Sequence, residues 1–399
     1  MNGYRTLPPY PVPDKPTDFD KKMLEVMERH RVVGLAAAFV KKGSLRWTKG
    51  YGWANLAECR RVDSETIFRV ASISKTVTAT ALMQQYEQGK LDLDDDITEY
   101  LGFAVRNPRY PDIPITCKQI MTHTSSLQDE YLSFALASRT SCPPSLKEFL
   151  IPAGRYYSDK VWGRYRPGSG HFEYSNTGSF ILATIVEKLS GQRFDVYCRN
   201  HIFQPLTMRD TSFNTQDFPH REKIAVLYTY DEENDAFAAA MDDFKSVRPD
   251  TVEYSRYMPG TNGSIFQPQG GLRTNVADLS KFLLAFMGDG CNGGGRILEK
   301  ETLEFMRREH LPKGKSGGFF KKSGLQLNIT DELIPRKRMI GHSGDAYGCL
   351  TGMYFIPEEE DGVIFFMNGM RQRKERGKFF AVEEDIVRCI YNEGLGSSE

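Results

Sequence analysis

The residues with the clearest chemical potential are a serine and a lysine spaced three apart, Ser72 and Lys75. Ser72 is the only serine in the chain with a lysine at this spacing. If Ser72 opens a helix, Lys75 lies one turn later on the same face, where its amine reaches the serine oxygen. A neighbouring base that takes the hydroxyl proton turns serine into a nucleophile. A helix-capping serine followed by an exposed lysine has the same pattern, so other motifs must decide between the two interpretations.

Two polar triplets follow in the chain, YSN at 174–176 and HSG at 342–344. Tyr174 is the only tyrosine with an asparagine two residues later. The second triplet has two competitors, because KSG at 315–317 and at 322–324 also places a basic residue before Ser-Gly. We favour 342–344, since a strand-like run, a turn and another strand-like run follow it, which is the arrangement implied by the family resemblance given below. The competitors lie in a glycine- and lysine-rich connection, which is typical of a solvated loop.

A G-x-S-x-G motif at residues 314–318 is rejected as a site for the nucleophile. A nucleophile elbow needs a strand before the serine and a helix after it. Here a helical pattern precedes the serine and a strand-like run follows it. The histidines, including His123 and His171, show no metal-binding spacing such as H-E-x-x-H. We therefore expect no metal and no cofactor.

Apolar side chains at helical or alternating spacing indicate the elements that must position these residues. The predicted helices begin after Thr17, run from Ser72 to a stop at Gly89, cover 117–123, run from 181 to a stop at Gly191, and cover 276–287, 303–310 and 379–391. The predicted strands cover 34–40, 45–53, 325–329, 349–356 and 362–367. Residues 214–263 show no clear period, and we assign them no element.

Strands near both ends of the chain, with helices between them, predict an α+β fold. We expect an antiparallel sheet that is built from both termini and flanked by helices, with a mostly helical insertion. Residues 1–70 and 290–399 would form the α/β sheet domain. Residues 71–289 would form a mostly helical domain that carries Ser72, with the site at the interface.

The three motifs, in this order and spacing, resemble the penicillin-recognising serine hydrolases. This family includes class C β-lactamases, serine D,D-peptidases, D-aminopeptidases and related esterases, and the class C form of the second motif is Y-x-N. The match extends to THTSSL at 122–127, where Ser126 replaces the usual glycine, and to the closing strand that ends at Asn368. The resemblance spans residues 20 to 390, roughly, and implies a β-lactamase-like fold.

The resemblance implies catalytic roles for Ser72, Lys75 and Tyr174. Ser72 would attack the substrate and become acylated. Lys75 can take the serine proton only when neutral, against a pKa near 10.4 for free lysine. Tyr174 would share this proton or pass it to the leaving group, and either residue fits the role of general base.

The remaining motif residues would bind the substrate. By resemblance, Asn176 would bind the amide of the acyl side chain and help to hold Lys75. His342, Ser343 and Gly344 would line the substrate, and the backbone N–H of Asp345 would join that of the nucleophile in an oxyanion hole. His342 can donate a hydrogen bond to a substrate carboxylate, with full charge only at lower pH.

We therefore predict a serine hydrolase that acts through an acyl-enzyme on amide or ester bonds, either D,D-peptidase- or D-aminopeptidase-like or esterase-like. Efficient β-lactamases carry lysine in the third motif, so His342 indicates weak or absent β-lactamase activity. The alternative is a non-catalytic scaffold or ligand sensor with the same fold. Such a protein would be expected to lose Ser72, Lys75 or Tyr174, and all three are present.

The composition favours a small-molecule or peptide substrate. Lys+Arg and Asp+Glu both number 52 among 399 residues, so no net charge favours nucleic acid or anionic membranes. No apolar run approaches the ~18 residues that span a bilayer, so we expect no membrane insertion. β-Lactams are candidate ligands or inhibitors, and the sequence gives no oligomeric state.

Cysteine usage and the N-terminus favour the cytoplasm. The seven cysteines are scattered and include no C-x-x-C pair, which indicates a reduced protein. The N-terminus shows no signal-peptide pattern, although a chain that had lost its natural leader would look the same.

Residues 128–167 have weak periodicity and many aromatic side chains. A long irregular segment of this kind is often a lid or a binding loop. The alternative is a hydrophobic patch that fastens the segment to the helices. We hypothesise that residues 156–165 shape substrate specificity, with Tyr157 and Trp162 as the determinants.

Overall fold

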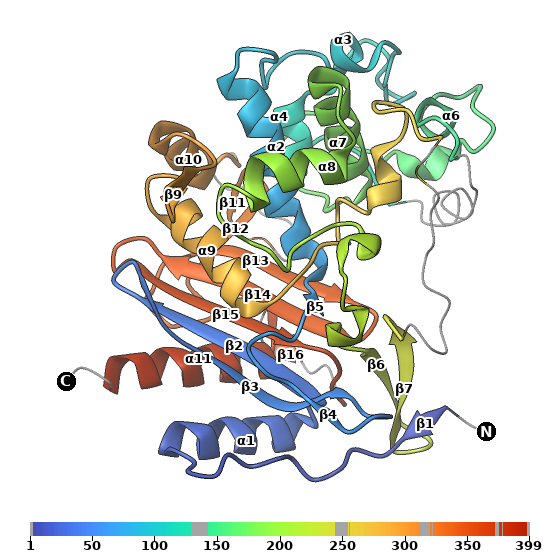
Figure 1. The fold of residues 1–399 in the computed structure, drawn as a ribbon. Helices are drawn as coiled ribbons and strands as arrows, with labels where there is room; N and C mark the ends of the chain where they lie inside the picture. Colours follow the sequence, from blue (N-terminus) through green and yellow to red (C-terminus); the bar gives the residue numbers. More distant parts are fainter. Residues whose placement is uncertain are drawn as a thin grey trace.

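An eight-stranded antiparallel sheet forms the centre of the protein (Figure 1). The computed structural model describes residues 3–129, 143–243, 254, 256–311, 320, 322–371, 375–376 and 378–396. The strand order is β11-β12-β13-β14-β15-β2-β3-β4. In chain order the strands are β2 (Gly34–Lys41), β3 (Ser44–Asn55), β4 (Arg60–Arg61), β11 (Lys322–Gly324), β12 (Leu327–Thr330), β13 (Met339–Ala346), β14 (Cys349–Ile356) and β15 (Asp361–Met367).

The two ends of the chain meet in the middle of this sheet. β15 pairs with β2 over six residue pairs, among them Ile364 with Ala38. The predicted α+β fold, with one antiparallel sheet built from both termini, is confirmed.

The sheet is buried on both faces, because its alternate side chains enter two different cores. Ala36, Ala38 and Val40 belong to the larger core, on the side of the inserted helices. Leu35 and Phe39 belong to a second core, which also includes side chains of α1 (Asp18–His30) and α11 (Ala381–Gly396). Figure 1 shows α1 and α11 on one face of the sheet and α9 on the other.

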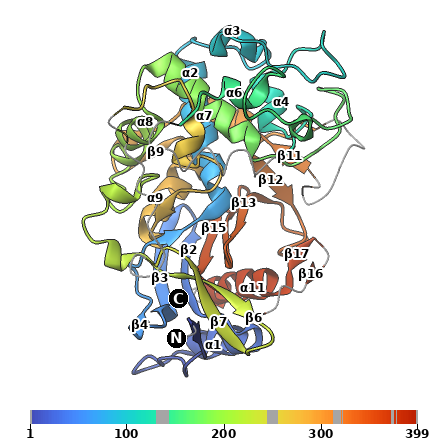
Figure 2. The same cartoon turned by 90° about the vertical axis from the view of Figure 1, so that its right-hand side faces the viewer.

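The inserted helices form a layer above the sheet (Figure 2). They are α2 (Ser74–Glu87), α3 (Ile97–Leu101), α4 (Cys117–Met121), α6 (Lys147–Leu150), α7 (Thr177–Ser190), α8 (Phe194–Cys198), α9 (Val276–Met287) and α10 (Lys300–Arg307). The central helix is α2, and twelve of its fourteen residues are buried. Burial on all sides fits a helix that is held by packing on every face.

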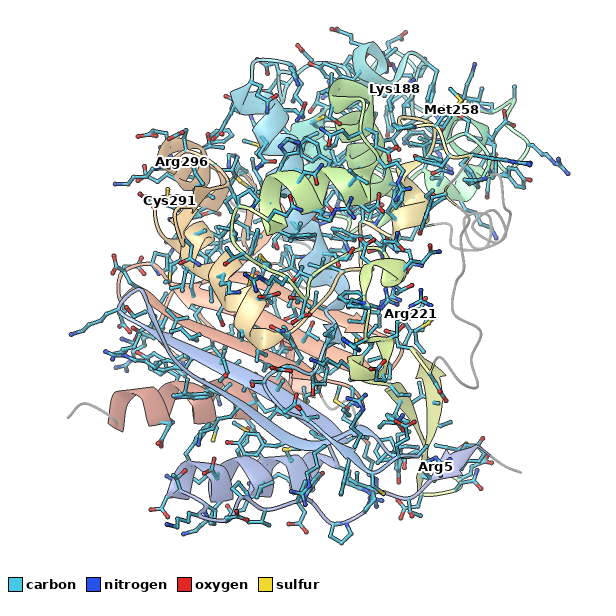
Figure 3. All side chains as sticks on the ribbon, in the orientation of Figure 1. Arg5, Lys188, Arg221, Met258, Cys291 and Arg296 are labelled. Atoms are coloured by element: carbon cyan, nitrogen blue, oxygen red, sulfur yellow. The ribbon has the colours of Figure 1, made fainter. Side chains whose placement is uncertain are left out.

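Residues 214–263, to which no element was assigned, contribute a hairpin of β6 (Leu227–Asp231) and β7 (Ala236–Met241). β7 also pairs with β1 (Tyr4–Arg5), so these strands form a small three-stranded sheet. Figure 3 shows Arg5 at the opposite end of the molecule from Lys188 and Met258, which lie in the helical layer. The division of the chain into two domains stays a prediction.

The remaining strands are short two-residue pairs. They are β5 (Phe68–Arg69) with β8 (Arg273–Thr274), β9 (Cys291–Asn292) with β10 (Gly295–Arg296), and β16 (Glu375–Arg376) with β17 (Phe379–Phe380). Within the described ranges, no helix is both long and apolar enough to cross a membrane. In the same part of the chain, no three His, Cys, Asp or Glu side chains group closely enough to hold a metal ion.

Candidate active site

Ser72 lies in a sharp turn between a strand and the central helix. A 3₁₀ turn, Ala71–Ile73, follows β5 and runs directly into α2, so the α-helix begins two residues later than the sequence suggested. Ala71 has a left-handed backbone with φ of 44°, which is unfavourable for a residue with a side chain. This turn leaves Ser72 half-buried at the N-terminal end of α2.

Lys75 lies in the first turn of α2, and its amine makes three polar contacts. Its Nζ is 3.1 Å from Ser72 Oγ, 2.5 Å from Asn176 Oδ1 and 2.9 Å from the carbonyl oxygen of Gln269. The side chain is fully buried, and burial lowers the pKa of Lys75 to about 7.

The contacts of Lys75 decide how a neutral amine would be arranged. A neutral amine has two N–H groups and one lone pair. The Asn176 and Gln269 oxygens can only accept hydrogen bonds, so they take both N–H groups. The lone pair is then left for the hydroxyl proton of Ser72. The geometry therefore suits proton transfer from Ser72 to Lys75.

Asp129 holds the second motif in place. The motif leads directly into the N-terminus of α7. The Asp129 carboxylate accepts hydrogen bonds from the backbone N–H of Asn176 at 2.6 Å and of Thr177 at 3.1 Å. It also accepts one from Asn176 Nδ2 at 2.8 Å. This bond turns Asn176 Oδ1 towards Lys75. Asp129 thus fixes the amide that orients the lysine.

Tyr174 lies between Lys75 and two histidines. The centre of its ring is 4.8 Å from Lys75 Nζ, 4.5 Å from the ring centre of His123 and 6.2 Å from that of His342. His123 Nδ1 accepts a hydrogen bond from the N–H of Ser175 at 3.2 Å. His123 therefore supports the second motif from behind.

The third motif lies within β13, not before a strand as the sequence suggested. His342 Nδ1 is 2.5 Å from the carbonyl oxygen of Ser343, which can only accept, so Nδ1 carries the proton. Burial and the neighbouring Lys75 lower the pKa of His342 to about 3, and the ring is neutral. Nε2 is therefore an acceptor. This arrangement favours an acceptor role for Nε2 over donation to a substrate carboxylate, and the substrate contact of His342 stays a prediction.

Gly344 brings β13 against the turn that carries the nucleophile. A Cβ atom at this position would lie 2.4 Å from the carbonyl oxygen of Val70 and 2.9 Å from the backbone nitrogen of Ser72. Only glycine allows this approach. Gly344 therefore brings the β13 backbone beside the backbone of Ser72, and Asp345 lines the same cavity as Ser72.

A cavity of about 440 Å³ joins the three motifs. The predicted site residues that line it are Ser72, Tyr174, Asn176, His342, Ser343 and Asp345. Lys75 contacts two of these residues, and Gly344 packs behind them. Asp129, Phe320, Leu350, Phe380 and Glu383 complete the lining.

Of the two competing KSG triplets, the one at 322–324 can be located, and it does not line this cavity. Lys322 lies on the edge strand β11, half-exposed, with its Nζ 3.3 Å from Glu309. The triplet at 315–317 and the G-x-S-x-G motif lie outside the described residues.

Comparison with known proteins decides the family. The beta-lactamase family model matches residues 19–384, which is most of the chain. The chain belongs to the beta-lactamase family. The resemblance to penicillin-recognising serine hydrolases is thereby confirmed, and the family groups serine hydrolases that include peptidases, amidases and esterases.

One curated relative of this beta-lactamase family member matches most of its length, and others match 44% to 50% of it. Penicillin-binding protein 4* of Bacillus subtilis (strain 168) is 27% identical over 343 residues, which are 86% of this chain and 69% of that protein. Seven other curated relatives are matched over 36% to 40% of their own length, so the chain spans less than half of each.

Two solved structures show the same fold. D-amino acid amidase from Ochrobactrum anthropi SV3 has a TM-score of 0.69 at 22% identity, over 96% of this chain and 100% of that one. EstCE1, a hydrolase with promiscuous acyltransferase activity, has a TM-score of 0.68 at 19% identity, over 94% and 98%. At these identities the likeness concerns the fold alone.

Two acidic residues that line the cavity, Asp129 and Glu383, were not predicted from the sequence. Asp129 is the second residue after the THTSSL segment, but nothing in its neighbours indicates that it binds the second motif. Glu383 lies in the first turn of a predicted helix, where acidic residues are common because they favour the helix dipole. Its place beside β13 is a long-range contact that no local pattern signals.

The aromatic side chains Tyr156, Tyr157 and Trp162 lie away from the cavity. Trp162 is 3% exposed and belongs to the larger core, and Tyr156 and Tyr157 pack against that core. None of the three is among the described residues that line the cavity. The patch that fastens the segment to the helices is therefore favoured over the specificity hypothesis. Tyr131 and Phe134 lie outside the described residues.

Proposed function

We propose that this protein is a serine hydrolase that cleaves amide or ester bonds through an acyl-enzyme on Ser72. The observation that carries the proposal is the buried Lys75 amine, 3.1 Å from Ser72 Oγ, with a pKa lowered to about 7. A near-neutral pKa gives a base that is unprotonated in a large fraction of molecules yet still able to accept a proton.

The reaction begins with proton transfer from Ser72 Oγ to Lys75 Nζ. Oγ then bonds to the substrate carbonyl carbon, and the carbonyl oxygen becomes an anion. The backbone N–H groups of Ser72 and Asp345 would stabilise this oxyanion. The close packing that Gly344 allows between β13 and the Ser72 turn supports their pairing.

The bond to the leaving amine or alcohol then breaks, and the leaving group takes up the proton. The proton passes from Lys75 Nζ, directly or through Tyr174, whose ring lies beside that amine. A water molecule next attacks the ester carbonyl of the acyl-enzyme and gives up a proton to the same base. The acid is released, and Ser72 regains its hydroxyl proton.

Relatives support a hydrolase of this chemical range. One solved relative is a D-amino acid amidase with D-phenylalanine bound, and another is a hydrolase with promiscuous acyltransferase activity. The family also contains penicillin-binding proteins, so β-lactams stay candidate ligands of this site.

Labelling with a fluorophosphonate, followed by intact-mass spectrometry, tests the nucleophile. We expect one adduct on the wild-type protein and none on Ser72→Ala, whose turnover should also fall by ~10⁴-fold or more. Ser264→Ala is the matched control, because Ser264 is also half-buried in a 3₁₀ turn but lies outside the cavity. It should be labelled like the wild type.

The absence of any adduct on folded wild-type protein would contradict the proposal. That result would favour the alternative of a non-catalytic scaffold or ligand sensor.

A further inference from the structure

One wall of the cavity carries a buried glutamate that the proposed chemistry does not use. Glu383 lies in the first turn of α11, is 1% exposed and lines the cavity together with Ser72. Its Oε1 accepts a hydrogen bond from Ser343 Oγ, which lies 2.8 Å from the hydroxyl of Tyr354. Its Oε2 has no hydrogen-bond partner among the described residues. A buried polar atom without a partner is unfavourable, so a missing hydrogen-bond partner is expected here.

His342 presents a second unused acceptor in the same cavity wall. Its Nδ1 proton is engaged by the Ser343 carbonyl, so Nε2 carries a lone pair. Within the described part of the chain, Nε2 has no hydrogen-bond partner, and the side chain is 2% exposed. Glu383 Oε2 and His342 Nε2 are therefore both buried in the cavity wall without a hydrogen-bond partner among the described residues.

The charges around the cavity favour a cation over an anion. Asp129, Asp345 and Glu383 line it, whereas its described lining includes no lysine or arginine. The Lys75 amine contacts the cavity through Ser72 and Asn176, but its N–H groups are engaged. A substrate carboxylate would find acceptors where it needs donors.

Burial raises the pKa of Glu383 to about 8. A positive charge placed beside Glu383 would oppose this effect, because an opposite charge favours the ionised form of a carboxyl group. At this pKa Glu383 is largely protonated at neutral pH, and binding of an ammonium group would ionise it, with its proton released to solvent, and give Oε2 a charged partner. Phe320, Leu350 and Phe380 line the same cavity and offer apolar contact for a side chain.

We propose that Glu383 and His342 form a subsite for a primary ammonium group, so that the preferred substrates are amides or esters of amino acids with a free amine. The inference rests on the proposed hydrolase function of Ser72. It reverses the polarity expected for the third motif, because the subsite accepts hydrogen bonds and excludes a substrate carboxylate. The cavity volume of about 440 Å³ suits a small molecule.

Three esters, two with an ammonium group and one without it, test the subsite kinetically. They are phenylalanine methyl ester, as the D and the L form, and methyl 3-phenylpropionate. For the better enantiomer we expect kcat/KM to exceed that of the neutral ester by about 10-fold or more, since hydrogen bonds to charged groups are the strong class. Glu383→Gln should lower this ratio by about 10-fold, mainly through KM.

The ratio of the two kcat/KM values is measured on one preparation of each variant. It therefore does not depend on the fraction of molecules that are folded. Glu384→Gln is the matched control, because Glu384 is the next residue of α11 and pairs with Arg388 at 2.9 Å. It should keep the wild-type ratio. An unchanged ratio in Glu383→Gln, or a wild-type preference for the neutral ester, would overturn the subsite while fluorophosphonate labelling of Ser72 still supports the hydrolase.

Binding to Ser72→Ala tests the subsite without catalysis. Calorimetry should show tighter binding of D- or L-phenylalanine amide than of 3-phenylpropionamide, and adding Glu383→Gln should remove most of the difference. Equal binding of the three amides, or none, would overturn the subsite. If labelling fails but this difference appears, the proposed hydrolase is wrong and the cavity is an amine-binding site.

Discussion

At the scale of single residues, the surroundings of Lys75 give the site its chemistry. A buried ammonium is expensive, and the protein supplies no carboxylate in direct contact with Nζ among the contacts described for it. The carboxylate of Asp129, which is hydrogen-bonded to Asn176, raises the pKa of Lys75. This effect is smaller than the lowering caused by burial. The amine is therefore balanced near neutrality.

The pH dependence of acylation follows from this balance. Only neutral Lys75 can accept the serine proton, and the neutral fraction grows as the pH rises through the lowered pKa of about 7. The rate of fluorophosphonate labelling should therefore rise through a midpoint near pH 7 and level off above it. Rates measured across the neutral range test this.

Tyr174→Phe separates the two candidates for the general base. If Lys75 is the base, the variant should show a lower plateau but keep its midpoint. Loss of the midpoint in Tyr174→Phe, or a wild-type rate that does not change with pH, would contradict the assignment to Lys75.

At the scale of elements, the site depends on the contact between β13 and the turn that precedes α2. The proposed oxyanion hole needs a backbone N–H group from each of these two elements. The contact exists because Gly344 leaves room for the carbonyl of Val70, whose oxygen also accepts a hydrogen bond from Thr351 Oγ1 at 2.9 Å. The backbone of β13 is thus held in direct contact with the backbone of the turn.

Gly344→Ala should separate the strand from the turn. Its Cβ would lie 2.4 Å from the Val70 oxygen, so the backbones must move apart. A shift of ~1 Å near the reacting atoms can lower the rate by about 10²-fold, and we expect a loss of this order in labelling rate. Gly270→Ala is the control, since its Cβ would approach Ala71 no closer than 3.7 Å. Equal losses in both variants would contradict this account.

The sequence predicts elements well where their pattern is local. Helix α7 and strands β2, β14 and β15 show clear periods, and each lies close to its predicted range. Strand β13 was missed, because its segment MIGHSGDA contains two glycines and several polar residues and looks like a loop. Its neighbours in the sheet, not its own residues, make it a strand.

The same reasoning explains which site residues could be predicted. Ser72, Lys75, Tyr174 and Asn176 sit in short motifs whose spacing can be recognised. Glu383 reaches the cavity only because α11 packs beneath β13, which no local pattern reveals.

At the scale of the whole molecule, Asn368 joins three distant segments of the chain. Its Nδ2 donates to the carbonyl oxygens of Trp53 at 3.1 Å and Val226 at 2.9 Å, and the side chain is fully buried. These oxygens belong to the end of β3 and the approach to β6, while Asn368 follows β15. One side chain therefore connects the main sheet to the small one.

Substitution of Asn368 should lower the free energy of unfolding, whereas the labelling rate of the molecules that remain folded should change little. Asn368→Leu leaves two buried carbonyls without a donor and should reduce the free energy of unfolding by ~1–3 kcal/mol. Asn368→Asp should reduce it further, because a carboxyl group would face those oxygens. Urea unfolding measures both, with labelling per folded molecule as the control. An Asp variant as stable as the Leu variant would contradict this explanation.

The pairing of β15 with β2 also governs how the protein is made. Val40 and its partner Gly362 are 322 residues apart (362 − 40), so β2 is synthesised long before β15. At 5–20 residues per second, the wait is roughly 15–65 s. During that time the β2–β3 hairpin leaves the ribosome with one edge open and its apolar residues uncovered. Such an edge can pair with other chains, so the nascent protein is exposed to aggregation at its N-terminal hairpin until the last strand arrives.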